Sequence, residues 1–274
     1  MQAGDQVTVD QADVVRIAAR AHEPDRYLAA LLSPAAARAD LIALAAFAGE
    51  VGRIPIYVRE PMMGRIRLQW WLERIESVSS GGHPVAAAVI ATAKRHDLST
   101  SRLTGLIEAH EDGLDDRPFA DEAALLAYVD GVDGALFELA AGICGIATPP
   151  DLVRDAGRAY GLARIAFETP AAIAHGRLML PNSATGTAGA LESTQILAAI
   201  HAVSATSRHY LAACSAALTQ LSRRSRSPFL PLALVEPYLR ALELAAPRPA
   251  AAMEIAPLQR AWRLLRCRWT GKVD

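Results

Sequence analysis

The stretch EPMMGRIRLQWW, residues 60–71, is the most informative part of this sequence. Its first two residues, Glu60 and Pro61, are typical of a helix start, because proline fits the first helical turn, where its missing N–H costs nothing. Four residues at helical spacing lie along one side of the predicted helix: Met63, Ile66, Trp70 and Arg74. The residues SSGG at 79–82 then end it.

On both sides of this stretch the chain reads as a series of helices. Ala and Leu are abundant and strong helix formers, whereas the alternating Val, Ile, Thr and Tyr of strands is nearly absent. Further helices are expected near 27–32, 35–52, 84–95, 99–111, 121–143, 150–170, 193–222, 227–244 and 262–269. Pro170 is expected to kink or stop the helix that begins near 150. These patterns predict an all-α bundle forming a single domain over 1–274.

The bulk properties exclude several classes of protein. A formal net charge of −1 argues against nucleic-acid binding. The three cysteines lie far apart, without zinc-site spacing, and fit a reducing compartment. The polar, acidic stretch 1–15 resembles neither a signal peptide nor a transit peptide, and no apolar run is long enough to cross a bilayer. We therefore expect a cytoplasmic protein, with peripheral contact at the inner membrane left open.

One short basic run and two aspartate groups each have two interpretations. The run at Arg223, Arg224 and Arg226 is either a solvated helix end or a contact to anionic lipid head groups. Asp130 and Asp133 are expected to form a surface pair on a helix. The aspartates of 112–116 are expected to belong to a solvated loop, although such a cluster could also bind a cation.

Three segments together resemble the squalene/phytoene synthase family, in that order and at about the right spacing. They are DRYL at 25–28 continuing through LIALAAF to Glu50, the stretch at 60–71, and YGLA at 160–163 followed by GRLMLP at 176–181. The resemblance covers about residues 22–270, the core of the domain. It implies the all-α isoprenoid-synthase fold, a helical bundle around a central cavity. It also implies head-to-head coupling of two prenyl diphosphates, with Mg²⁺ held by aspartates to neutralise the leaving group.

The chain departs from the family where those aspartates would stand. After Glu50 it reads VGRIPI at 51–56, with no aspartate. After residues 160–163 it reads RIAFETPAAIAH, which leaves one carboxylate, Glu168. Glu50 and Glu168 are vestigial candidates only, and Arg53, one turn from Glu50, is expected to pair with it. We therefore expect neither a catalytic residue nor a metal site.

This loss resembles a divergent branch of the family that includes a mitochondrial assembly factor of complex I (NADH dehydrogenase). The segment KRHDL at 94–98 and LDD at 114–116 also look similar to that branch. The resemblance implies an assembly role, with respiratory complex subunits as partners. We expect a non-catalytic assembly or binding factor. The alternatives are an active prenyl diphosphate transferase with a degenerate metal site, which would need Mg²⁺, and an isoprenoid- or lipid-binding protein.

Several polar and aromatic residues are candidates for lining a cavity or binding a diphosphate. They are Arg53, Arg67, Gln69, Trp70, Tyr160 and Arg164. For Arg67 and Gln69, contact with a diphosphate and a buried structural ion pair remain equally open, and the two cannot share a helix face. Trp70 and Trp71 point about 100° apart, so one is expected to face the core. His175 is expected to be an exposed histidine near a helix end, although it could also be a ligand.

Overall fold

The computed structural model describes residues 3–58, 60–114, 118–174, 177–181, 193–245 and 255–273. Helices account for nearly all regular structure there, so the predicted all-α class is confirmed. The helices pack into two units: Met1–Leu114 with Glu138–Ala147, and Asp115–Phe137 with Thr148–Asp274. No helix in the described ranges is both long enough and apolar enough to span a membrane.

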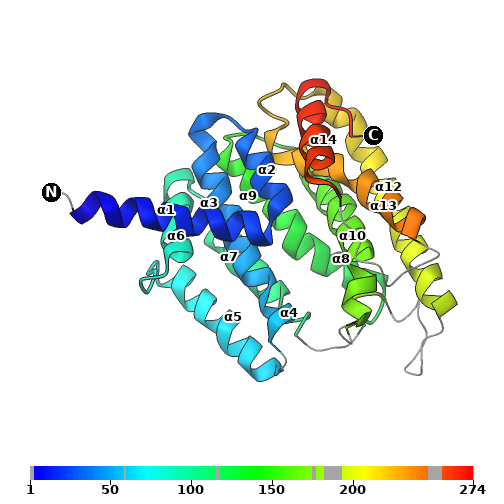
Figure 1. The fold of residues 1–274 in the computed structure, drawn as a ribbon, viewed down its shortest axis with the longest axis horizontal. Helices are drawn as coiled ribbons and strands as arrows, with labels where there is room; N and C mark the ends of the chain where they lie inside the picture. The colour runs from blue at the N-terminus through cyan, green and yellow to red at the C-terminus, as the bar shows by residue number, and fades with distance from the viewer. Residues whose placement is uncertain are drawn as a thin grey trace. The chain divides into compact units, whose positions relative to one another are not determined.

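The first unit is built around α3, the most apolar of its long helices. Its helices are α1 (Ala3–His22), α2 (Pro24–Leu31), α3 (Ala35–Gly52), α4 (Ile54–Tyr57), α5 (Pro61–Glu76), α6 (Pro84–His96) and α7 (Thr100–Ala109). The side chains of 41–49 are all buried, because α1, α2 and α6 pack around α3. Figure 1 shows α1 crossing α3 and α6.

Helix α1 was missed by the sequence reasoning, which expected the first helix at 27–32. Most of its described side chains are exposed, including the apolar Val14 and Ile17, and only Val15, Ala18 and Ala19 are buried. A buried face this small produces a weak helical pattern. The close approach of α1 to α3 depends on Gly49, because a Cβ there would lie 2.6 Å from the Cβ of His22.

In α5 the side that packs against the protein differs from the side that the sequence suggested. Gly64, Leu68, Trp71 and Ile75 are buried, whereas Met63 and Ile66 are exposed. Leu114 lies so close to Gly64 that a Cβ there would be 2.3 Å from its Cδ2. A small residue therefore belongs to the core face, which a search for large apolar side chains overlooks.

The second unit is built around α10 (Pro150–Ala174), which packs against α12 (Ser193–Gln220) and α13 (Val235–Ala245). Figure 1 shows these three helices running side by side. Its other helices are α8 (Glu122–Val129), a π-helical turn η1 (Asp130–Gly134), a 3-10 helix η2 (Ser227–Leu234) and α14 (Pro257–Thr270). Helix α9 (Ala135–Ile143) follows η1 and spans the boundary between the units.

Two predictions about these helices are corrected. The expected single helix at 121–143 has its predicted core face buried, but five residues form the π-helical turn Asp130–Gly134. Helix α10 continues through Pro170 to Ala174, so of the two expected outcomes, a kink or a stop, the stop is wrong. The predicted loop at 181–192 and the predicted linker around Pro247 and Pro249 lie almost entirely outside the described residues.

Candidate functional site

The C-terminal turn of α3 carries the first candidate pair, Glu50 and Arg53. Both side chains are only partly exposed, and Arg53 Nη1 lies 3.7 Å from Glu50 Oε1. The ion pair expected from the one-turn spacing is therefore present. The guanidinium stands three residues after Glu50, within the stretch where the family resemblance led us to look for an aspartate.

Arg53 is further fixed by an imidazole and a phenol ring. Its Nη1 lies 3.0 Å from Nε2 of His22 at the end of α1, so this ring nitrogen accepts a hydrogen bond. Its guanidinium carbon also lies 5.0 Å from the centre of the Tyr57 ring, within the range of a cation–π contact. Three elements of the first unit thus hold one guanidinium in place.

These residues open onto a pocket of about 380 Å³ within the first unit. It is lined by Glu50, Arg53, Ile54, Tyr57, Arg67, Trp70, Trp71 and His83. Four of the eight candidates from the sequence line it together: Glu50, Arg53, Arg67 and Trp70. The lining contains two guanidinium groups and one carboxylate, so its charged side chains carry a net positive charge.

An aromatic cluster forms one wall of this pocket. The ring centres of Trp70 and Trp71 lie 5.1 Å apart, and His83 lies 5.5 Å from Trp70 and 5.3 Å from Trp71, all edge to face. Trp71 is buried against Phe47, whereas Trp70 is partly exposed. As expected for adjacent helical residues, one tryptophan faces the core and the other lies nearer the surface. The wall offers flat apolar surface beside the two guanidinium groups.

The other four candidates, Gln69, Tyr160, Arg164 and Glu168, do not line this pocket. Gln69 is exposed, and its Nε2 donates to Glu73 Oε1 at 3.4 Å along α5. Tyr160 is 1% exposed in the core of the second unit, where its ring packs edge to face on Phe137. Arg164 pairs with Asp133 in the same unit.

A second polar cluster lies in the second unit, around Asp133. This carboxylate is 1% exposed and 3.3 Å from Arg164 Nη2, so the predicted surface pair with Asp130 is wrong. Burial raises the pKa of the nearby Tyr128 hydroxyl to about 12, with further influence from Arg164, Asp133, Glu168 and Arg177. Neither Tyr128 nor Arg177 was among the candidates from the sequence, although Arg177 belongs to the family-like segment at 176–181. Glu168 is an exposed residue on α10.

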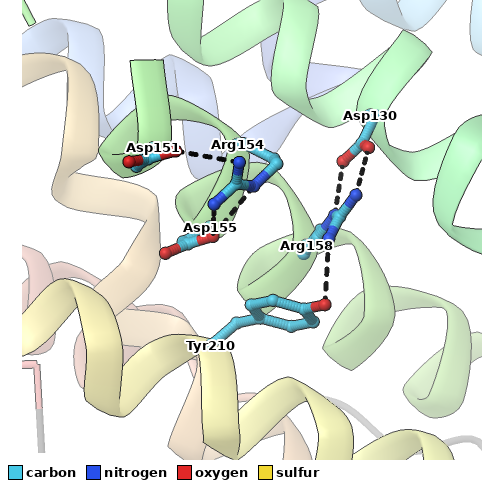
Figure 2. Close-up of polar contacts among 6 residues, drawn as sticks. All are labelled: Asp130, Asp151, Arg154, Asp155, Arg158 and Tyr210. Atoms are coloured by element: carbon cyan, nitrogen blue, oxygen red, sulfur yellow. Dashed lines mark hydrogen bonds and ion pairs between the residues drawn. The ribbon is translucent and has the colours of Figure 1, made fainter. Parts of the chain in front are cut away.

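The partner of Asp130 was also missed. Arg158 donates from Nε and Nη2 to both carboxylate oxygens of Asp130, at 2.8 and 2.7 Å, and from Nη1 to the Tyr210 hydroxyl at 2.9 Å. Figure 2 shows this chain of contacts, with a separate group of Asp151, Arg154 and Asp155 beside it. Asp130 thus joins the π-helical turn to α10 and α12.

The donor set of the pocket does not fit Mg²⁺. This ion binds oxygen ligands, chiefly carboxylates and water, whereas the pocket has one carboxylate, already paired with a guanidinium. Among the described residues, no group of three or more His, Cys, Asp or Glu side chains is arranged to hold a metal. Asp115, Asp116 and His175, considered in the sequence as ligands, lie outside the described residues.

The segment at 94–98 has a structural role in the first unit. Arg95, His96 and Thr92 all contact the buried carboxylate of Asp40, with His96 Nε2 at 2.7 Å and Thr92 Oγ1 at 3.1 Å. Burial alone would raise the pKa of Asp40, but hydrogen bonds from His96, Arg95 and Thr92 outweigh it and lower that pKa. This segment therefore fixes α6 to α3.

The fold and the three family-like segments place the chain among known proteins. The family model for squalene/phytoene synthase matches residues 19–265, so the chain belongs to this family. A squalene synthase, HpnC from Alicyclobacillus acidocaldarius, matches with a TM-score of 0.71 at 17% identity, covering 88% of this chain and 95% of that one. A dehydrosqualene synthase matches with a TM-score of 0.74 at 14% identity, covering 96% and 97%. At these identities the structures establish the fold alone.

Among curated proteins, the chain is similar to NADH dehydrogenase (ubiquinone) complex I, assembly factor 6. The identity is 30% to the Bos taurus protein and 29% to the Homo sapiens protein, each over 170 residues and 59% of this chain. The match covers 50% of each relative, so the chain spans about half the length of the curated relatives it matches. The predicted resemblance to the family and to this branch is confirmed.

Proposed function

We propose that this protein is a non-catalytic assembly or binding factor of the squalene/phytoene synthase family, acting on a respiratory complex. The observation that carries the proposal is the charge of the pocket in the first unit. There Arg53 neutralises Glu50, and Arg67 adds a second positive charge. Prenyl coupling needs divalent ions to draw off diphosphate, and this lining repels cations.

The partner class is proposed from the relatives. The bovine and human proteins are named assembly factors of complex I, and this chain shares with them a region of 170 residues. We propose respiratory complex subunits as partners. The chain would meet them in the cytoplasm or at the inner membrane, as one domain over 1–274 with a core of about 22–270.

A tagged form of the chain, purified from its own cells, tests the assembly proposal. Subunits of the respiratory NADH dehydrogenase should be enriched over a tag-only control and identified by mass spectrometry. Cells that lack the protein should contain less assembled complex on a native gel, and re-expression of the protein should restore the amount of assembled complex. Unchanged assembly in cells that lack the chain would contradict the proposal.

A second candidate function is the binding of an anionic isoprenoid or lipid without chemistry. It is supported by the pairing of Arg53 and Arg67 with the apolar wall of Trp70 and Trp71 in one pocket. Guanidinium groups bind phosphate oxygens directly, and the indole rings would cover the adjoining apolar part of the ligand. Native mass spectrometry of the purified protein tests this, since a bound lipid or prenyl phosphate should be retained and should be lost on replacing Arg67.

The remaining candidate is a transferase with a degenerate metal site, in which Glu50 and Glu168 hold Mg²⁺. Each carboxylate would have to act alone on its own helix, and Glu50 would first have to leave Arg53. In that case, Glu50→Ala or Glu168→Ala would abolish diphosphate release. We rank this candidate last because the residues present do not fit the ion.

A further inference from the structure

Helix α14 carries an apolar stripe on the side that faces away from its own unit. Its four side chains are exposed: Leu258 85%, Trp262 64%, Leu265 36% and Trp269 57%. Their spacing of four, three and four residues places them within a sector of about 60° on a helical wheel. Leu264 and Cys267, both fully buried, lie on the opposite side, where α14 packs on η2. We call Leu258, Trp262, Leu265 and Trp269 the α14 stripe.

The described residues of the C-terminal segment carry charges of one sign. Residues 255–273 contain no acidic residue and five basic ones, Arg260, Arg263, Arg266, Arg268 and Lys272. On the helical wheel, Arg266 and Arg268 flank the stripe on either side. The guanidinium carbon of Arg223, from the basic run at 223–226, lies 4.1 Å from the centre of the Trp269 ring.

The helix is fixed in the orientation that exposes the stripe. Arg226 is buried, and its Nε and Nη2 donate to the carbonyls of Leu218 and Thr219 at the end of α12, both at 3.0 Å. Its Nη1 donates to the carbonyl of Trp269 at the end of α14, at 3.2 Å. One guanidinium therefore caps two helix ends. The interpretation of this run as only a solvated helix end is wrong for Arg226.

We propose that the α14 stripe inserts into the interface of an anionic membrane. A helix with Trp and Leu on one face and basic residues on its flanks lies in the plane of the interface, with the apolar face among the acyl chains. The flanking arginines then reach the lipid phosphates. This charge pattern favours a lipid surface over a second copy of the chain, whose own α14 would be equally basic. The inference uses only α12, η2 and α14, and is independent of the pocket and of the respiratory partner.

Vesicle sedimentation of the full chain tests this proposal. The protein should sediment with vesicles of phosphatidylcholine containing about one-third phosphatidylglycerol and stay in solution with phosphatidylcholine alone. Trp262→Ser with Trp269→Ser should weaken binding by roughly tenfold or more. Arg266→Gln with Lys272→Gln should weaken it less, and most at low salt. Leu244→Ser, which removes an 84% exposed leucine from α13, is the matched control and should bind as the wild type does.

Thermal melting followed by circular dichroism should first give the same melting temperature for each variant as for the wild type, because all the replaced side chains lie outside the core. Failure of the wild type to bind anionic vesicles would overturn the proposal. Equal binding by the wild type and the double tryptophan variant would do the same. A dimer in sedimentation equilibrium that the double tryptophan variant dissociates would also overturn it, because the stripe would then be an interface between copies.

Discussion

Glu50 Oε1 and Arg53 Nη1 lie 3.7 Å apart, one turn from each other at the C-terminal end of α3. This ion pair leaves the end of α3 nearly neutral, and Arg67 makes the charged lining of the pocket positive as a whole. A lining of this charge favours an anion over a divalent cation. The chain therefore combines the fold of its family with a pocket whose residues do not fit Mg²⁺.

The positive pocket predicts metal-independent anion binding. Arg67→Gln should weaken the binding of inorganic diphosphate by roughly tenfold, as expected for the loss of one charge-assisted hydrogen bond. Isothermal titration in the presence of a chelator measures it. Lys94→Gln removes the same charge from an exposed position on α6 and is the control. An equal loss in both variants would mean that net charge alone governs binding.

The buried carboxylate of Asp40 predicts a pH-dependent stability. Its pKa is lowered in the folded protein, so its contribution is complete above its ordinary pKa near 4 and is lost as the pH falls through the folded value. Asp40→Asn should cost about 2 kcal/mol at pH 7, and the difference from the wild type should shrink toward pH 3. Urea unfolding at several pH values measures it. Asp151→Asn, at an 80% exposed side chain, should cost far less at every pH.

The crossing of α10 and the π-helical turn predicts a steric limit at Gly157. A Cβ at this position would lie 2.5 Å from the Cα of Gly134, so the backbones would have to separate. Gly157→Ala should destabilise the protein by about 3 kcal/mol in urea unfolding. Gly105→Ala, in α7 with open space around the new methyl group, should instead be neutral or stabilise by about 0.5 kcal/mol. Similar effects of the two substitutions would contradict this packing.

The Asp130–Arg158 pair predicts a measurable coupling between the π-helical turn and α10. Both side chains are partly buried and joined by two hydrogen bonds. A double-mutant cycle with Asp130→Asn and Arg158→Met should give a coupling energy of about 1–2 kcal/mol. Arg102 and Glu138, a more exposed pair at 3.0 Å, should give less than about 1 kcal/mol. A coupling no larger than that of the exposed pair would mean that the contact adds no stability.

The sequence was sufficient to predict the all-α fold class and most of the helices, because core residues such as Val129, Val132 and Leu136 repeat at helical spacing. Four of the candidates named from the sequence line the pocket, because Glu50 and Arg53 share one helical turn and Arg67 and Trp70 share another. The sequence failed where a contact joins distant segments. The partners of Asp130 and Asp133 lie on α10, and no local pattern reveals them.

Two further misses have physical causes. The π-helical turn at Asp130–Gly134 is favoured by contacts with α10, where Gly157 allows the backbones to approach. No residue inside the turn signals it, because glycine and aspartate are equally typical of surface positions. Arg226 looked like part of a solvated basic run, since the two helix ends that it caps are separated from each other by about fifty residues.

The most direct test of the central claim is a diphosphate-release assay with the purified protein, Mg²⁺ and farnesyl or geranylgeranyl diphosphate. We predict release at the rate of the buffer alone, with no change in Glu50→Ala or Glu168→Ala. Release above that background by the wild type, abolished by either substitution, would contradict the account and establish an active transferase.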